Sequence, residues 1–366
     1  MIYSIGVVCL CLIALLTRVN KKTLLVLTFL FLTGIAILFE PQAGLDLYKH
    51  YQTLDVMREI GYVNSVARFH FQMQNLPVYS VFFYLVSLLK YDKLLLIITY
   101  LVVYGCMFGV LSMCVEDHGW SPKSWNLGYA IVMLVTNAYS ITGIRYTLAF
   151  AVVFLFMYID LVRKQHRIIS LVVYVLMCLL HDGMLLIVLL RFLLYIPSNR
   201  VTSKLKYLLV FWQVWLTAIE NLLRMIPNDF FSSVADKLML YTTSESANMW
   251  VSGVGMETLA TMRLIILCVT LIFYFMSKSR HEDNYQKMLI LLILFCFGGI
   301  SKAALIDRYT NAELLFSIPF MLEINGESNY DNERNRFLIK LQLLPMLVLI
   351  LLYFISLVLY QYQYFL

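Results

Sequence analysis

Arg145 is the residue best placed to do chemistry in this chain. It lies in the run NAYSITGIRYTLAFAVVFL, between two long apolar stretches. A charged side chain kept at membrane depth costs roughly 2.5–3.5 kcal/mol on insertion scales, so such a residue usually has a function. A guanidinium stays charged and binds phosphate oxygens through a two-pronged fork. Arg145 is therefore a candidate phosphate ligand. The alternative is an arginine that reaches the lipid headgroups from a helix end.

His181 and Asp182 form a second unusual pair, because they follow the apolar run VYVLMCLL and precede GMLLIVLL. Either side chain could orient or deprotonate a hydroxyl group. The alternative is a helix break, since Asp182 and Gly183 favour a turn.

A third group of charges precedes a later apolar run, in GGISKAALIDRYTNAELLF. Arg308 leads directly into that run, as Arg145 does. Lys302 and Asp307 come just before it, and Asp307 could simply pair with a neighbouring cation. Arg224 and Arg263 lie at the ends of two other apolar runs, where each could contact either a ligand or a lipid headgroup.

The segment PQAGLDLYKHY gathers Asp46, Tyr48, His50 and Tyr51. A helix would place Asp46 and His50 on one face, because they are four residues apart. Two ligands do not make a metal site, which usually needs three or four, so we expect no metal. An ordinary polar helix face is the alternative.

The motifs of several enzyme classes are missing from the sequence. It contains no Walker A loop, no H-E-x-x-H and no G-x-S-x-G. ATP-driven transport and zinc-dependent hydrolysis are therefore disfavoured. The seven cysteines all lie in apolar runs, which predicts neither a disulfide framework nor a zinc site. They are Cys9, Cys11, Cys106, Cys114, Cys178, Cys268 and Cys296.

The composition indicates which elements must position these residues. The 366 residues are 61% hydrophobic and only 14% charged, whereas soluble proteins carry about 25% charged residues. The net charge of +6 is modest and favours Lys and Arg at a cytoplasmic membrane face over nucleic-acid binding. We therefore expect an all-α polytopic integral membrane protein, with residues 1–366 forming a single transmembrane domain.

The apolar runs predict about 12 transmembrane helices, within a range of about 11 to 13, since a span needs about 20 apolar residues. Basic residues follow the first run rather than precede it, which favours an uncleaved first span with the N-terminus outside. The predicted spans are 2–16, 23–39, 94–115, 126–142, 145–162, 168–181, 183–196, 205–223, 259–277, 288–300, 309–322 and 338–361.

Residues 78–89 are apolar but number only twelve. If they crossed the membrane, the short basic loops at 163–167, 200–206 and 278–287 would all lie outside, against the positive-inside rule. We therefore predict a re-entrant or interfacial segment at 78–89.

That choice places the unusual residues on one side of the membrane. An outer segment over 40–93, with an amphipathic helix between Asp46 and Ala67, then shares the outer face with Arg145 and His181. An outer loop at 224–258 and the stretch 301–308 lie on the same face.

Four local patterns resemble the EpsG-type branch of the Wzy polysaccharide polymerases. These are an outer Asp and Tyr cluster, a span that begins G-I-R-x-x-L-A, a span that ends in His, and an Arg-Tyr that opens a later span. In this sequence they correspond to 46–51, 143–149, His181, and Arg308 with Tyr309.

The resemblance implies a membrane glycosyltransferase with a fold like the GT-C enzymes. Such a polymerase joins oligosaccharide repeat units carried on undecaprenyl pyrophosphate into an O-antigen, capsule or exopolysaccharide. It works in the bacterial cytoplasmic (inner) membrane, with its site facing the periplasm or exterior. It uses no nucleotide sugar, cofactor or metal. A chain-length regulator and a flippase of the same pathway are the expected partners, besides the bilayer.

The resemblance also implies roles for the residues. Arg145 and Arg308 bind the leaving pyrophosphate, and His181 or Asp46 orients or deprotonates the acceptor hydroxyl. An apolar groove near 78–89 holds the polyprenyl chain. The remaining expected substrate contacts are Tyr48, His50, Tyr146, Asp182, Arg224, Arg263, Lys302, Asp307 and Tyr309.

Four other functions compete with this one. A flippase for the same lipid-linked sugar would need charges along a central cavity and on both faces. A polysaccharide O-acyltransferase fed from the cytoplasm would have its His and Arg residues at the inner face. A ligase that transfers finished polymer would share nearly all of the chemistry. A non-catalytic scaffold would leave Arg145 and His181 without a role.

Overall fold

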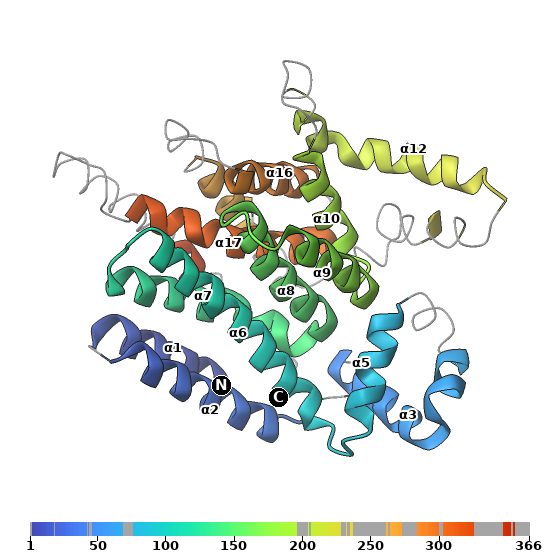
Figure 1. The fold of residues 1–366 in the computed structure, drawn as a ribbon, viewed down its shortest axis with the longest axis horizontal. Coiled ribbons are helices and arrows are strands. Elements are labelled where there is room, and N and C mark those ends of the chain that lie inside the picture. Colours follow the sequence, from blue (N-terminus) through green and yellow to red (C-terminus); the bar gives the residue numbers. More distant parts are fainter. Residues whose placement is uncertain are drawn as a thin grey trace. The chain divides into compact units, whose positions relative to one another are not determined.

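The computed structural model describes most of the chain (Figure 1). The described residues are 2–17, 19–41, 43, 46–68, 76–195, 204, 206–227, 232, 235–236, 261–262, 264–272, 284–299, 303–325, 347–352 and 354–355. Of these, the side chains of 137–142, 206, 213, 216, 303–308 and 323–325 lie outside the description.

The described part is all-helical and contains no strand. Its α-helices are α1 (Ile2–Leu16), α2 (Lys21–Leu38), α3 (Asp46–Arg68), α5 (Pro77–Ser87), α6 (Lys93–Asp117), α7 (Pro122–Thr142), α8 (Ile144–Leu161), α9 (Arg167–Leu180), α10 (Met184–Leu193), α12 (Trp212–Arg224), α16 (Asn284–Gly298) and α17 (Ala303–Asn325), and η1 (Lys206–Phe211) is a 3-10 helix. The all-α prediction is confirmed for this part of the chain.

The chain was predicted to form one transmembrane domain, but its residues divide into two compact units. Unit 1 comprises Met1–Leu189, Met321–Arg336 and Gln361–Leu366, and unit 2 comprises Leu190–Phe320 and Phe337–Tyr360. The cluster described below belongs to unit 1.

Three described helices are long and apolar enough to cross a bilayer, by length and composition. They are α2, α6 and α8, with 18, 25 and 18 residues. Helices α1, α5, α9, α10 and α16 are apolar but shorter. Most of the predicted runs that the structure describes are therefore helical, and three of the described helices meet the length that a span requires.

The predicted span 205–223 is divided in two. It consists of the 3-10 helix η1 followed by the 13-residue helix α12, and Phe211 at the junction has φ −105° and ψ 16°. A 13-residue helix is only about 20 Å long, and the bilayer core is about 30 Å thick. Because α12 also carries Glu220 and Arg224, its composition suits an amphipathic helix better than a span. The predicted runs 259–277 and 338–361 and the loop 224–258 are described only in part.

Helix α3 confirms the predicted helix between Asp46 and Ala67, and it bends at Gly61. Gly61 has φ +76° and ψ 174°, a backbone conformation that side chains with a Cβ rarely adopt. The 11 residues of α5 begin with Pro77 in the first turn, where its missing N–H costs nothing. At about 16 Å, α5 is too short to cross a bilayer as a helix, in agreement with the predicted short segment at 78–89.

Polar contacts hold α3 against α5 and the start of α6. The Arg58 side chain donates to the Ser87 carbonyl at 3.1 Å and pairs with Asp55 and Asp92. Tyr62 and Ser80 share a hydrogen bond of 3.1 Å between their hydroxyls. These contacts fix the face that α5 presents to the rest of unit 1.

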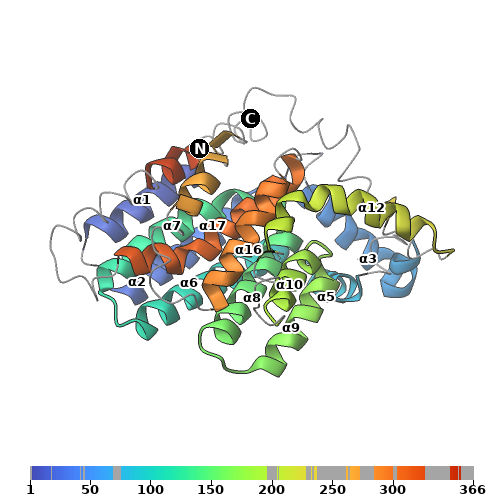
Figure 2. The ribbon, with the colours of Figure 1, turned by 90° about the horizontal axis from the view of Figure 1, so that it is seen from above.

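Helix α8 is central to the packing of unit 1. It packs against α6, α7 and α9, and α9 in turn packs against α5 (Figures 1 and 2). Nearly every residue on its inward side is buried, including Phe150, Phe154 and Tyr158. The 18 residues of α8 extend about 27 Å, so its two ends are far apart.

Candidate functional site

The break at Gly143 places Arg145 in the first turn of α8. Gly143 has φ −113° and ψ 50°, which ends α7 and begins a new helix. Its carbonyl accepts hydrogen bonds from both the backbone N–H and the hydroxyl of Thr147, each at 2.9 Å. The first turn of a helix has unpaired backbone N–H groups and a partial positive charge, which favour an anion.

The guanidinium of Arg145 lies on the ring of Tyr79 from α5. Its Cζ atom is 4.5 Å from the ring centroid, within the range of a cation–π contact. Tyr79 is buried. Among the residues that the structure describes, no carboxylate lies within ion-pair distance of Arg145. The charge is therefore held in place by an aromatic ring without being neutralised by an acid.

His50 from α3 also packs against Tyr79, the aromatic residue of α5 that contacts Arg145. Its ring centroid is 5.0 Å from that of Phe83 and 6.5 Å from that of Tyr79. The pKa of His50 is lowered from 6.5 to about 3, chiefly by burial and in smaller part by the positive charges of Arg145 and Lys49. His50 is therefore a neutral imidazole at physiological pH.

Tyr79 keeps its proton in this setting. Burial raises the pKa of its phenol, while the Arg145 charge and a hydrogen bond with Thr53 act in the opposite direction. The ring thus offers a π face to the cation and a hydroxyl to a polar neighbour.

His181 ends α9 in extended conformation, with φ −150° and ψ 116°. Its ring packs edge-on against Tyr146, with centroids 5.5 Å apart. The N–H of Gly183 donates to His181 Nδ1 at 3.0 Å, so the proton of the neutral ring lies on Nε2. Asp182 Oδ1 accepts from the same N–H at 3.0 Å, which confirms the predicted turn. His181 is nevertheless buried, so the turn does not expose its ring to solvent.

Two sets of contacting side chains therefore lie at the start of α8, one around Arg145 and one formed by Tyr146 and His181, and we call the five residues together the Arg145 cluster. They are Arg145, Tyr79, His50, Tyr146 and His181, contributed by α3, α5, α8 and the end of α9. The cluster contains one cation, two imidazoles and two phenols, and no acid. Such a set can bind an anion and can donate hydrogen bonds to ligand hydroxyls or phosphate oxygens.

Four of these five residues were predicted from sequence, and Tyr79 was not. Residues 78–89 were interpreted as the wall of a lipid groove because they are apolar. Tyr79 and Phe83 are four residues apart, so they share a face of α5, and their rings are 4.5 Å apart. That aromatic pair, following a helix-starting Pro77, is the signal that could have pointed to a cation-binding face.

Two predicted residues of the outer segment lie on the same helix as His50. Asp46 precedes His50 by one turn of α3 and pairs with Lys49 at 3.8 Å, and both of these side chains are exposed. Tyr48 is half-buried. The local pair with Lys49 corresponds to the polar helix face that was the alternative for Asp46.

Two predicted residues of unit 2 have structural contacts. Arg224 pairs with Glu220 at 3.3 Å and with Asp236 at 2.9 Å, so its charge is balanced by protein acids. Tyr309 is buried, edge-on to Phe295 at 5.0 Å between centroids. Asp307 and Arg308 belong to α17, but their side chains lie outside the described part. Arg263 and Lys302 also lie outside the described residues.

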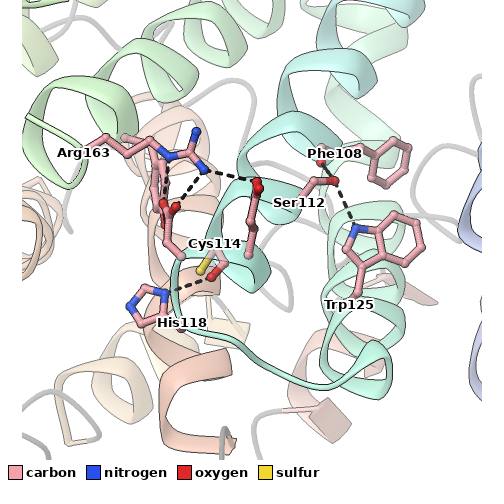
Figure 3. A network of polar contacts seen from close by, with 9 residues as sticks. Phe108, Ser112, Cys114, His118, Trp125 and Arg163 are labelled. Atoms are coloured by element: carbon pink, nitrogen blue, oxygen red, sulfur yellow. Dashed lines mark hydrogen bonds and ion pairs between the residues drawn. The ribbon is translucent and has the colours of Figure 1, made fainter. Parts of the chain in front are cut away.

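The opposite end of α8 contains a different arginine. Arg163 donates to Asp117 at 2.8 and 2.7 Å and lies 3.4 Å from Glu116 (Figure 3). The hydroxyl of Tyr158 also donates to Asp117, at 3.2 Å. This network joins the ends of α6 and α8, and the charge of Arg163 is balanced by the carboxylates of Asp117 and Glu116.

The described part of the chain is all-helical, and three of its helices are long and apolar enough to cross a bilayer. At one end of the long helix α8, the guanidinium of Arg145 packs on an aromatic ring. No family model matches the chain, and neither the curated proteins nor the solved structures contain a significant match. We therefore base the function on the residues and their geometry.

Proposed function

We propose that this protein is a polysaccharide polymerase of the bacterial cytoplasmic membrane. It would join undecaprenyl-pyrophosphate-linked oligosaccharide repeat units by glycosyl transfer at the outer face, within a fold of about 12 transmembrane helices. The observation that carries the proposal is Arg145 itself. Its guanidinium is backed by Tyr79, adjoins His50 and has no acid partner among the described residues.

The two ends of α8 support the proposed outer-face position of the site. Arg163, Lys164 and Arg167 cluster at its C-terminal end and belong on the cytoplasmic side by the positive-inside rule. Because α8 extends about 27 Å, the Arg145 cluster at its N-terminal end then lies near the outer face. The short helix α5 beside it cannot cross the bilayer and suits a re-entrant or interfacial position.

The chemistry of the leaving group explains why the site needs an arginine without an acid partner. A hydroxyl of one repeat unit attacks the anomeric carbon of another, the bond from that carbon to the lipid pyrophosphate breaks, and the hydroxyl proton is released to water. Negative charge grows on the pyrophosphate during this step. A fixed cation in a partly buried site stabilises that charge more than water does.

His181 suits a positioning role better than that of a general base. Its Nδ1 is occupied by the N–H of Gly183, so Nε2 carries a proton and can only donate. We assign His181 the role of holding a phosphate oxygen or a sugar hydroxyl through Nε2. Tyr146 fixes the ring plane through its edge-on contact.

The test is the lipid-linked glycan profile of cells that lack this chain, complemented with the wild type or with Arg145→Ala. A polymerase predicts single lipid-linked repeat units and no long chains in the deletion and in the variant, with long chains restored by the wild type. Long chains in the deletion strain would contradict the proposal.

The same profile separates the competing functions. A missing flippase leaves the repeat units on the cytoplasmic leaflet, and a missing ligase leaves long polymer on the lipid carrier. A missing O-acyltransferase leaves chains of normal length that lack a substituent.

A further inference from the structure

A stripe of buried polar residues runs along α17, which contains the predicted span 309–322. Thr310, Glu313 and Ser317 follow one another at spacings of three and four residues, so they share one face of the helix. The exposed fraction of each side chain is 0%. Polar residues at such positions inside a membrane helix usually have a function.

Glu313 and Thr310 have no hydrogen-bond partner in this buried position. Neither carboxylate oxygen of Glu313 is paired, and the hydroxyl of Thr310 is also unpaired. Ser317, by contrast, donates to the carbonyl of Leu314 at 2.7 Å, within its own helix. The stripe thus contains two unsatisfied polar side chains one helical turn apart.

Two other elements of unit 2 supply the surroundings of Glu313. Thr270, in the helical residues 264–272, lies beside the carboxyl group and donates its own proton to the Ile266 carbonyl at 2.9 Å. The Cys296 thiol of α16 lies near both Glu313 and Thr310. Among the described side chains, no Lys, Arg or His lies within ion-pair distance of Glu313.

An ionised carboxylate without a cation is very costly in an apolar interior, and a buried acid generally becomes neutral instead. From the burial, the unpaired carboxyl oxygens and the lack of a cation partner among the described side chains, we propose that Glu313 is an intramembrane proton-binding site that carries one bound proton in the resting protein. Because Thr270 donates elsewhere, its oxygen is free to accept from the protonated carboxyl. The hydroxyl of Thr310 provides a second oxygen at the site.

The donor set favours a proton over a metal cation. The described oxygens are the two of the Glu313 carboxyl and one each from Thr270 and Thr310. A hard metal cation takes about six to eight oxygen ligands and prefers several charged ones, whereas a proton needs one carboxyl and one acceptor.

Infrared spectroscopy of the purified full-length chain at pH 7 tests the proposal directly. A protonated carboxylic acid absorbs at a higher frequency than an ionised carboxylate, and the solvent-exposed acids are ionised at this pH. The spectrum of the wild type minus that of Glu313→Gln is expected to contain one carboxylic-acid band and no carboxylate bands. Carboxylate bands in that difference would overturn the proposal.

Glu220→Gln provides the matched control, because Glu220 is also a buried acid of unit 2 but is paired with Arg224. Its difference spectrum is expected to contain carboxylate bands only. The spectra are recorded in Na⁺ and in K⁺ at equal ionic strength. Loss of the Glu313 acid band in Na⁺ alone would mean that the site takes sodium, which overturns the assignment of a proton.

Thermal unfolding gives an independent readout that also detects misfolding. Glu313→Gln resembles the neutral acid in shape and polarity, so its unfolding midpoint is expected to match that of the wild type. A large drop for Glu313→Gln would indicate that the native carboxyl is ionised and paired, and would contradict the proposal. Neither measurement depends on polymer formation. The proton-binding proposal can therefore fail while the polymerase proposal stands, and the reverse.

Discussion

The two ends of helix α8 hold two arginines in opposite environments. Arg163, at the C-terminal end, is matched by Asp117 and Glu116. Arg145, at the N-terminal end, lies on the ring of Tyr79 and has no acid partner among the described residues. An arginine matched by acids fastens helices together, because its charge is already balanced. An arginine backed by an aromatic ring keeps a charge that no acid balances.

The largest effect is expected from removing the unmatched cation. Arg145→Ala should lower the rate of chain elongation by on the order of 10²–10³, because one preorganised donor to the leaving group is lost. Arg163→Ala should lower the stability of the protein while keeping the rate per folded molecule. Elongation by purified protein, corrected for the folded fraction, measures both. Equal loss of rate in the two variants would remove the distinction between the two ends.

The fork of the guanidinium can be tested at the same position. Arg145→Lys keeps the charge but loses the planar two-pronged geometry. We expect a rate between those of the wild type and Arg145→Ala. A rate for the Lys variant equal to that of the wild type would mean that charge alone is needed.

His181 should have the next largest effect. Loss of a hydrogen bond to a charged group costs about 1.5–3 kcal/mol, which corresponds to roughly 10- to 150-fold in rate. His181→Phe keeps the edge-on contact with Tyr146 but removes the Nε2 donor. Its rate of elongation should fall by that factor at every pH between 6 and 8. A loss that grows as the pH rises and disappears at low pH, where the wild-type imidazole is protonated, would instead indicate a general base.

Tyr79 should have a smaller effect, because it acts through Arg145. A cation–π contact contributes about 0.5–2 kcal/mol, which corresponds to roughly 2- to 30-fold. Tyr79→Leu removes the π face and should weaken the binding of a polyprenyl pyrophosphate by that factor. Tyr79→Phe keeps the face and should bind nearly as the wild type does. Equal weakening in both variants would assign the effect to the hydroxyl.

The smallest expected effect is the contribution of His50 to the pH dependence of protein stability. The pKa of His50 is about 3 in the folded protein, below the ordinary value of 6.5 for a solvent-exposed histidine. The unfolded chain therefore takes up the proton first, so the stability is complete above pH 6.5 and is lost as the pH falls toward 3. Between pH 7 and pH 6 the free energy of unfolding should fall by about 0.7 kcal/mol.

The control for this prediction is His50→Phe, which preserves an aromatic contact with Phe83. Chemical denaturation at the two pH values measures the slope. The variant should lose this part of the pH dependence. An unchanged slope would show that His50 does not titrate as its burial predicts.

The helix positions could be predicted because apolar runs of sufficient length have few alternatives to a helix in a membrane. The limits of α1 match the predicted run, at Ile2 and Leu16. The break within 205–223 could not be predicted from hydropathy. There the local charges Glu220 and Arg224 and the packing of Trp212 against Phe295 decide the outcome.

The ionisable residues of the candidate site could be predicted from the sequence. Arg145 and His181 are conspicuous because ionisable residues are rare in apolar runs. Tyr79 was not, since an aromatic residue in an apolar helix is the ordinary case, and its contact with Arg145 spans 66 positions of the chain. Glu313 was also overlooked. Its burial and its unpaired oxygens appear only once α16, α17 and residues 264–272 are packed.

The central claim is that Arg145, and not Arg163, holds the pyrophosphate of the substrate. The most direct measurement is the binding of a short polyprenyl pyrophosphate to the purified wild type, Arg145→Ala and Arg163→Ala, with the corresponding polyprenyl alcohol as the control ligand. The account predicts that Arg145→Ala loses the preference for the pyrophosphate over the alcohol, while Arg163→Ala keeps it. An unchanged preference in Arg145→Ala would contradict the account.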